Sequence, residues 1–557
     1  MTFLATAFVF VATIARAANV SCPPGDENYP RFYEDAAQFE KAIAGAADFE
    51  PSNEKLSGIV VPHHLLAAHL VATGFKAASG FSYKRIVILT PDHFRKADKP
   101  FATTARGFES ELGTVATDRD AVAKLLAANV SIESSCLFGR DHGIRALLPF
   151  VRHYFPDVPV VPVAIALKST RADWDAMAIA LEGIIDTDTL VIESTDFSHY
   201  LPQHEARRFD QQTLNVLASG SLDQLARLRQ PDHLDSLGAL YVQMKLQREK
   251  FGVAPLVIAN ENAQQYGSAY VAETTSYMVI LFGGFGTRYN DPSPKNVGIT
   301  YFAGDTNFGR AMKHVLICDG AEDNVLQAVL TRTRGRPLVV NLEGVILPNV
   351  PEAIDDMTLA MPEDLTIAWL KKLNVAAVSL ANNHAFDLGP SGYAETIRAL
   401  DAAGIRWFGQ GEVLDLPGMD VVGLSDLDTN AARQVDLLTP ELLDRLIRPD
   451  AKKATIAFVH WGREYVDEPS EREQMLAEEM RLRSVTAIVG GHPHVASHRL
   501  DALAGGDVLQ LYSLGNFLFD QSADRASGVL LELRVFEQGT VFGRLIPLPN
   551  LFDMAKE

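Results

Sequence analysis

Short apolar runs rich in β-branched residues alternate with helical patterns along almost the whole chain, and this alternation restricts the fold more than any other feature. In the first half the apolar runs lie at 58–61, 85–89, 158–165, 190–194 and 276–282. Helical patterns fall between them, for instance at 171–185, 204–217 and 236–250. Because this alternation is typical of α/β folds, we predict α/β architecture for both halves of the chain.

A segment rich in Gly, Pro, Ser and Asn interrupts the alternation near the middle of the chain. It covers residues 284–296, after which apolar runs and helical patterns begin again. A chain of 557 residues is longer than one hydrophobic core usually serves, so two or more domains are expected. Since Gly and Pro clusters favour linkers, we predict a first domain at 19–283, a linker at 284–296 and a second domain at 297–557.

The N-terminus has the pattern of an export signal. Residues 3–14 form an apolar run of signal-peptide length, and Ala15-Arg16-Ala17 matches the small-x-small pattern that precedes a cleavage site. We therefore expect residues 1–18 to be a signal peptide and the protein to be secreted or periplasmic. A cytoplasmic protein with an intact N-terminus is the alternative. No later stretch is long and apolar enough for a transmembrane segment.

Charge and cysteine content exclude several classes of function. The net charge of −20 argues against a nucleic acid or an anionic membrane as partner. The 3 cysteines are too few and too scattered for a disulfide framework or a structural zinc site. A bound metal ion would therefore depend on His, Asp, Asn and Glu side chains.

In the second half, the apolar runs end in residues that can bind metal ions. The runs read VGITYFAGD, PLVVNLE, VAAVSLANNH, TIAFVHWG and AIVGGHPH. The candidate metal ligands that follow from them are Asp305, Asn307, Glu343, Asn383, His460, His492 and His494. Ligands bind beyond the carboxyl ends of the strands in open α/β sheets, so we expect these residues to gather at one end. Pro493 stiffens the backbone between His492 and His494, and in an extended segment both histidine side chains would point to the same side of the chain.

This donor set predicts the kind of chemistry. Carboxylate, amide and imidazole ligands suit Mn, Zn or Fe, and a bridging acid can hold two ions close together. Such ions lower the pKa of a shared water and supply a hydroxide nucleophile. His384, beside Asn383, is placed to act as a catalytic residue on the leaving group. Asn382 and Asp387 are better explained as ordinary polar residues at a strand end.

Histidines also follow the apolar runs of the first half. They occur in VVPHHL, LTPDHF, DHGIRALLPF and STDFSHY. Two histidines and one carboxylate form the usual face for non-haem Fe(II). We predict His63 and His93 as metal ligands, with His142 and His199 either completing the set of ligands or acting as catalytic acid and base.

The motifs of the second half resemble, in order, those of the CapA family, which is linked to capsule and poly-γ-glutamate biosynthesis. They read AGDTNFGR, NLEG, ANNHAFDLG, HWGREY, GGHPHV and YSLGNFLFD, over about residues 296–550. The resemblance implies a calcineurin-like metallophosphatase sandwich. It places Asp305 in the first ligand motif, Glu343 as the bridging acid, Asn383 and His384 as the Asn-His pair, His460 as the lone histidine, and His492 and His494 as the closing pair. Asn307 stands where the phosphatase pattern has His, so one ion is expected to be weakly held or absent.

The motifs of the first half are similar to those of the Memo family, the AmmeMemoRadiSam system protein B, whose fold resembles class III extradiol dioxygenases. The similarity covers about residues 25–283 and includes ENYPRFYEDAAQFEKAI at 27–43. It maps His63, His93 and His199 onto family histidines. The cysteine ligand of some members has no counterpart here. Alignment through Gly238 puts Asp232 in its place, with His233 and Asp235 as near alternatives, and a carboxylate favours Fe(II), Mn or Zn over copper.

Together the two resemblances imply a metal-dependent hydrolase or transferase of polymer biosynthesis, with up to two ions in the second domain and one in an accessory first domain. The substrate would be an envelope polymer or a small phosphorylated or amide compound. One alternative is a non-catalytic metal-binding scaffold that binds polymer synthesis or export proteins. Another is an iron-dependent, dioxygenase-like redox enzyme in the first domain, and a relic pocket without metal is the third.

Overall fold

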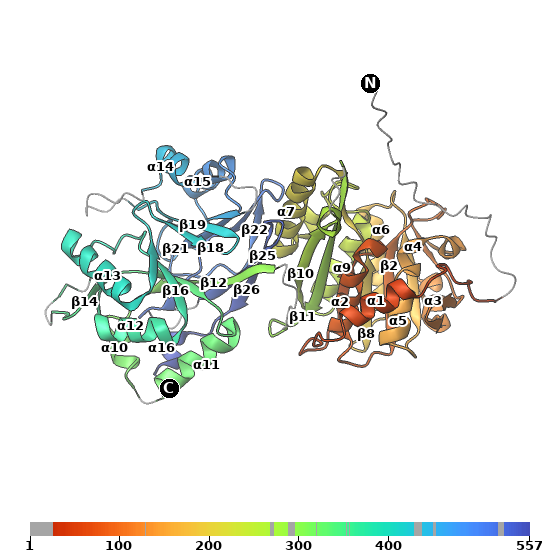
Figure 1. Ribbon diagram of the computed structural model, residues 1–557, viewed down its shortest axis with the longest axis horizontal. Helices are drawn as coiled ribbons and strands as arrows, with labels where there is room; N and C mark the ends of the chain where they lie inside the picture. Colours follow the sequence, from red (N-terminus) through yellow and green to blue (C-terminus); the bar gives the residue numbers. More distant parts are fainter. Residues whose placement is uncertain are drawn as a thin grey trace, which may run out of the picture.

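The structure, a computed structural model, consists of two α/β domains with mixed sheets, as predicted. It describes residues 26–128, 130–267, 272–287, 296–318, 320–351, 354–355, 357–427, 437–448, 453–521 and 528–556. Figure 1 shows the two domains side by side, the second coloured green to blue. The expected signal peptide lies outside the described residues, as does most of the expected linker. No helix in the described ranges is long and apolar enough to cross a membrane.

The first domain is built on a 9-stranded mixed sheet. Its strands, in spatial order, are β10 (Ala254–Asn262), β11 (Thr274–Gly283), β1 (Gly58–Val61), β8 (Thr189–Ser194), β2 (Arg85–Pro91), β7 (Val160–Ile165), β3 (Phe101–Thr103) and β6 (Ile132–Ser134), and β9 (Phe197–Leu201) pairs with β11. The central strands β1, β8, β2 and β7 are parallel. They are buried on both faces, which explains why their sequences are continuous apolar runs.

Helices cover both faces of this sheet and leave the carboxyl ends of its central strands free. One core packs α1 (Ala37–Gly45), α2 (Ala68–Ala78), α4 (His142–Arg145) and α5 (Leu148–Tyr154) against one face. The other core packs α3 (Arg119–Ala127), α6 (Arg171–Glu182), α7 (Gln203–Ser219) and α9 (Leu237–Glu249) against the opposite face. The histidine-bearing segments after β1 and β2 therefore begin at the same edge of the sheet.

The second domain consists of two sheets packed face to face. The first contains β17 (Arg406–Phe408), β16 (Val375–Ser379), β13 (Leu338–Leu342), β12 (Asn296–Thr306), β25 (Val529–Phe536) and β26 (Val541–Pro547), with β24 (Asn516–Leu518) beside β12. The second contains β18 (Val413–Leu416), β19 (Met419–Ser425), β20 (Ala454–His460), β21 (Ala487–Gly491), β23 (Val508–Leu511) and β22 (Asp501–Leu503). Side chains from both sheets form one core between them, in which Phe302 and Phe458 meet edge to face.

Helical layers cover the outer faces of these sheets. Helices α11 (Ala321–Thr333), α12 (Glu363–Lys372) and α13 (Gly389–Ala403) pack on the first sheet, and α14 (Pro440–Leu446) and α15 (Glu471–Leu482) on the second. The five strands expected to deliver metal ligands are thus divided between two sheets, instead of lying in one open sheet. Strands β12, β13 and β16 belong to one, and β20 and β21 to the other.

Helix α7 of the first domain joins the two domains. It packs against β22 and β26 of the second domain, and Figure 1 shows it beside β22. The Gln211 amide donates to the backbone oxygen of Val541 and accepts from its nitrogen, each at 2.8 Å. Asn215 donates to the Gly506 backbone oxygen at 2.7 Å. Phe542 of the second domain belongs to a core cluster of the first, so the contact is both polar and apolar.

A buried carboxyl group lies at the same contact. Asp210 of α7 accepts hydrogen bonds from Ser198 at 2.7 Å, Asn260 at 3.2 Å and Gln538 at 3.1 Å. Gln538 follows β25 of the second domain, whereas the other donors belong to the first. Burial raises the pKa of Asp210. The contact therefore depends on hydrogen bonds that both domains must supply.

A buried cluster of charged side chains links β25 to the adjacent strands β12 and β26. Glu532 accepts from Tyr301 at 2.9 Å and Arg544 at 3.0 Å, and Arg534 lies 3.3 Å away. Burial alone would raise the pKa of Glu532, but Arg544 and Arg534 outweigh it and lower the pKa to about 2.

Glu532→Gln is expected to lower the free energy of unfolding at pH 7 by about 3 kcal/mol, because it leaves two buried guanidinium groups without their counter-charge. The folded pKa is depressed, so the carboxylate stabilises fully above pH 4.5, its ordinary value, and this contribution is lost as the pH falls through 2. In urea unfolding, the gap between wild type and variant should therefore shrink over this range. Exposed Glu412→Gln is the control, and a Glu532→Gln protein as stable as wild type would contradict the prediction.

Candidate metal centres

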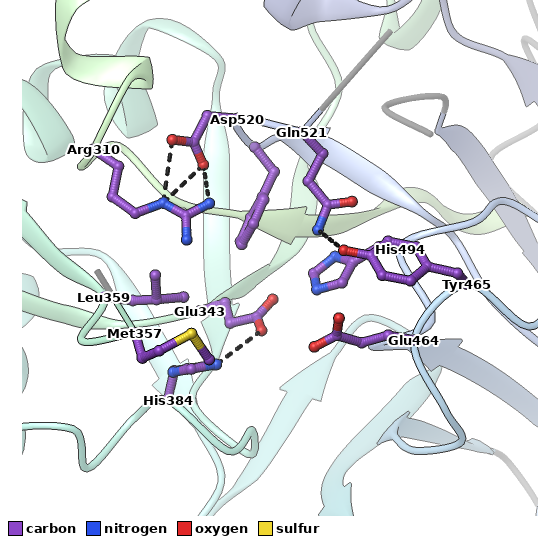
Figure 2. A pocket seen from close by; sticks show the side chains of 11 residues that line it. Arg310, Glu343, Met357, Leu359, His384, Glu464, Tyr465, His494, Asp520 and Gln521 are labelled. Carbon is purple, nitrogen blue, oxygen red and sulfur yellow. Dashed lines mark hydrogen bonds and ion pairs between the residues drawn. The ribbon is translucent and has the colours of Figure 1, made fainter. Parts of the chain in front are cut away.

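A pocket of about 340 Å³ opens in the second domain, where the carboxyl ends of strands from both sheets meet. Glu343, His384 and His494 lie at its base, as Figure 2 shows. Arg310 and Glu464 lie on opposite walls. Two of the residues predicted to bind metal in this domain, Glu343 and His494, therefore border a space that a small ligand can enter.

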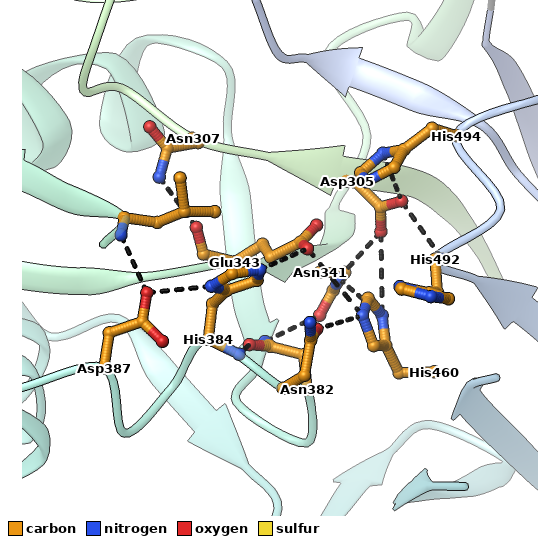
Figure 3. A network of polar contacts seen from close by, with 12 residues as sticks. Asp305, Asn307, Asn341, Glu343, Asn382, His384, Asp387, His460, His492 and His494 are labelled. Atoms are coloured by element: carbon orange, nitrogen blue, oxygen red, sulfur yellow. Dashed lines mark hydrogen bonds and ion pairs between the residues drawn. The ribbon is translucent and has the colours of Figure 1, made fainter. Parts of the chain in front are cut away.

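Each of these residues comes from the end of a strand. Asp305 is near the end of β12, Glu343 follows β13, Asn383 and His384 lie in the loop after β16, His460 ends β20, and His492 and His494 follow β21. Figure 3 shows these residues in one network of polar contacts and labels all of them but Asn383. Asn383 joins through its side-chain oxygen, 2.8 Å from His460 Nε2.

Two groups of three ligands overlap at Glu343. Asp305, Glu343 and His494 form one group, and Glu343, His460 and His492 form the other, with all ligand atoms of a group within 4.8 Å of one another. All five residues are buried. Glu343 Oε2 and His492 Nδ1 are buried and have no hydrogen-bond partner in the described part of the chain. Since unpartnered buried polar atoms are costly, these donors fit divalent cations such as Mn, Zn or Fe.

Short polar contacts and opposite charges link the members of the first group. Asp305 Oδ2 lies 3.2 Å from His494 Nδ1, and Asp305 Oδ1 accepts from Asn341 at 2.8 Å. Burial would raise the pKa of Asp305, but His494 and His460 hold it below its usual range. Burial and the charge of Asp305 raise the pKa of Glu343 to about 7. Burial opposes a charged His494, yet Asp305 and Glu343 raise its pKa to about 9. The group thus retains a proton that a bound cation would replace.

The histidines of the second group are neutral. Burial lowers the pKa of His460 well below its ordinary value and that of His492 to about 4. Neutral imidazole is the form that binds metals. The segment around Pro493 is not extended, because His492 and His494 have φ of 90° and 55°. Left-handed backbone at non-glycine residues is strained and concentrates at functional sites, and here it turns both rings toward the cluster.

Asn307 supports the loop that carries Glu343. Its Nδ2 donates to the Glu343 backbone oxygen at 2.7 Å, and its Oδ1 accepts from the Gly309 nitrogen at 2.8 Å. The amide is occupied in holding the loop that carries Glu343. The structure gives Asn307 this supporting role, and its role as a metal ligand stays a prediction.

Three polar residues that were not predicted complete the network. Asn341 lies between Asp305 and His460, with its Nδ2 3.2 Å from His460 Nδ1. Asn382 donates to the Asn341 oxygen at 3.0 Å. Asp387 accepts from His384 Nδ1 at 2.8 Å and so fixes the ring, a specific contact for a residue expected only to be an ordinary polar residue at a strand end. A buried amide inside the apolar β13 was the one sequence signal for Asn341.

The first domain holds a second cluster. His63, His93 and His142 form one group within 4.8 Å, and His63, Asp196 and Asp235 form another. The Nε2 atoms of His63 and His93 lie 3.0 Å apart. Asp141 accepts from His93 Nδ1 at 2.9 Å and fixes this ring. Ring nitrogens that converge in this way, beside carboxylates, fit a divalent cation.

Charge is unevenly distributed over this cluster. Burial would lower the pKa of His93, but Asp141 and Asp235 raise it to about 10. Burial lowers the pKa of His142 to about 3, with help from the neighbouring histidines. His142 lies in one of the two candidate ligand groups, a position consistent with one of the two roles predicted for it. His199 is absent from both groups and lies on the wall of an adjoining pocket of about 660 Å³.

The structure places Asp235, one of the two near alternatives, in the first-domain cluster, whereas Asp232, the predicted ligand, lies outside it. Asp232 forms an ion pair with Arg229 at 2.9 Å and is partly exposed. Asp235 Oδ2 lies 3.1 Å from His63 Nε2 and 3.6 Å from His93 Nε2. The backbone nitrogen of Asp235 donates to the Asp196 oxygen at 3.0 Å, which holds it beside the end of β8.

Comparison with known proteins divides the chain in the same way. Residues 28–256 match the family model described as Memo-like protein, and residues 300–417 and 426–521 match that of the bacterial capsule synthesis protein PGA_cap. A MEMO1 family protein of Pyrobaculum aerophilum is 25% identical over 251 residues, which is 41% of this chain and 84% of that protein.

Two relatives match the second domain. The PGA biosynthesis protein CapA of Bacillus subtilis is 30% identical over 263 residues, which is 43% of this chain and 68% of that protein. The capsule biosynthesis protein CapA of Bacillus anthracis is 30% identical over 274 residues, which is 44% of this chain and 66% of that protein. The chain thus spans about two thirds of the length of these relatives. It belongs to the bacterial capsule synthesis protein family through its second domain, which follows a Memo-like domain.

Proposed function

We propose that the second domain is a metal-dependent hydrolase or transferase that acts on an envelope polymer, or on a precursor of it, in capsule or poly-γ-glutamate biosynthesis. The observation that carries this proposal is Glu343, a buried carboxylate shared by two groups of metal ligands at the base of a pocket. Two sheets packed between helical layers are consistent with the metallophosphatase-like sandwich that the family implies.

Asp305, Glu343 and His494 would hold one ion, and His460 and His492 would hold a second with Glu343. When bound, such ions supply a hydroxide nucleophile and neutralise charge on the group attacked. His384 presents Nε2 toward Glu343, at 3.9 Å from Oε1, while Asp387 holds its other nitrogen. Burial would lower the pKa of His384, but Asp387 and Glu343 raise it. A protonated His384 can donate to the leaving group.

Turnover with Mn, Zn or Fe on phosphoester, peptide and γ-glutamyl substrates tests the proposal in the full-length protein. A chelator should abolish turnover, and the metal should restore it. His460→Ala should lower it by at least roughly 100-fold, since even outer partners of metal ligands cost 10- to 100-fold. Exposed His498→Ala is the matched control. Turnover unaffected by His460→Ala would contradict the proposal, and tight metal binding without turnover would favour a scaffold that binds polymer synthesis or export proteins.

For the first domain we propose an accessory centre in which His63, His93, His142 and Asp235 hold one Fe(II), Mn or Zn ion. The adjoining pocket of about 660 Å³ favours a second candidate function, metal-dependent redox chemistry on a small molecule. Oxygen uptake that requires His63 and His93 would support that candidate.

We also propose that residues 1–18 direct export, for which a mature N-terminus at Ala18 in mass spectrometry is the expected result.

A further inference from the structure

Glu464 places an unbalanced negative charge on the wall of the second-domain pocket. It lies in the loop after β20, is exposed, and forms no ion pair with any residue that the structure describes. Figure 2 shows its carboxylate directed into the pocket, beside His494 and Glu343. The other carboxylate at the rim, that of Asp520 on the opposite wall, is paired with Arg310. Glu464 is therefore available to a charged group of a ligand.

Arg310 offers the opposite charge from the facing wall. Its Nε donates to Asp520 Oδ1 at 3.0 Å and to Oδ2 at 3.1 Å, and its Nη2 also bonds Asp520. Asp520 is itself fixed by the Ala311 backbone nitrogen at 2.9 Å. Figure 2 shows the remaining terminal nitrogen turned away from Asp520, with no bond drawn to any of the residues around the pocket. A guanidinium fixed along one edge presents its other donors in a defined direction, which suits a carboxylate.

We infer that the pocket recognises an amino-acid end of its substrate, binding the ammonium group through Glu464 and a carboxylate through Arg310. The volume of about 340 Å³ is near the lower end of the usual range for small-molecule sites, about 300–1,000 Å³. A phosphomonoester dianion would lie beside the charge of Glu464 and be repelled by it, whereas an ammonium group would be attracted. The inference rests on the proposed function only in taking Glu343 and His384 as the place of reaction. Glu464 and Arg310 determine specificity and are not catalytic residues.

Calorimetric binding to the metal-loaded, full-length protein tests the inference. The probes are γ-glutamyl-glutamate, its N-acetyl derivative and the derivative in which the α-carboxylate beside the free amine is converted to an amide. Wild type should prefer the free amine over the N-acetyl probe by roughly 10- to 100-fold, the usual worth of a hydrogen bond between charged groups. Glu464→Gln should remove this preference, and Glu464→Lys should reverse it. The control is Glu468→Gln, an exposed carboxylate on the same loop that pairs with Arg499 and is not part of this pocket.

A second variant tests the facing wall. Arg310→Lys keeps a charge for Asp520 and so preserves the fold, but it should reduce the preference for the free carboxylate over the α-amide. The inference is overturned if wild type binds amine and N-acetyl probes equally, if it binds neither, or if Glu464→Gln keeps the preference. These outcomes are independent of turnover, so a protein that binds as expected but lacks metal-dependent turnover would refute only the proposed function.

Discussion

Replacing Glu343 with glutamine is expected to remove both metal ions proposed for the second domain and to abolish the proposed metal-dependent turnover. Glu343 is the one residue common to both groups of ligands, so no other single change should reach both. We expect affinity for both ions to fall by more than roughly 100-fold, beyond the loss produced by changing a partner outside the ligands themselves. His492→Ala, which affects one group only, should remove a single ion. Metal analysis of the purified proteins measures this graded loss.

The same variant separates metal loss from misfolding. Burial raises the pKa of Glu343 to about 7, which means that its charged form is unfavourable in the metal-free fold. Glu343→Gln should therefore unfold in the presence of a chelator at a temperature equal to or above that of wild type. The rise in unfolding temperature that Mn or Zn gives to wild type should disappear, because a ligand that binds only the folded state stabilises it. Retention of both ions by Glu343→Gln would refute the shared-ligand arrangement.

Asp235→Asn is expected to remove the ion proposed for the first domain, whereas Asp232→Asn should leave it in place. Asp235 faces His63 and His93. Burial would raise the pKa of Asp235, but these two histidines keep it well below the usual range, so the carboxylate stays charged. Asp232 is paired with Arg229 outside the cluster and is the matched control. Asp235→Cys should shift the preference from Mn toward copper, since thiolates favour soft metals. Equal metal content in the Asn variants would refute the assignment.

The parts of the molecule that the sequence predicts well are those governed by local patterns. The runs at β1, β2 and β8 are apolar because both faces of the strands are buried, and His63 and His93 follow them directly. The position of Asp235 depends instead on a backbone hydrogen bond to Asp196, in the loop between β8 and β9. No local pattern in the loop separates Asp232 from Asp235, so the sequence alone does not indicate which of the two lies in the cluster.

The second domain shows the same limit at a larger scale. Strands β13 and β20 have similar apolar sequences that end in polar residues, yet they lie in different sheets. Sheet membership depends on long-range pairing, for instance the antiparallel pairing of β25 with β12, which brings together residues more than 200 positions apart. Likewise, Asn307 has the residue type and position of a ligand, and only the backbone path of its loop turns it into a support for Glu343.

The contact around Asp210 has a consequence for how the protein can be studied. Cutting the chain between the domains would deprive this buried carboxyl of the Gln538 amide and would bare Phe536 and Phe542, which are buried against the first domain. Each severed half would expose an apolar, hydrogen-bond-deficient face, and so would tend to aggregate. Ser198, which precedes His199 in the chain, donates to Asp210 and so takes part in the same contact between the domains. Dissection of the two centres is therefore better done by point substitution in the intact polypeptide than by truncation.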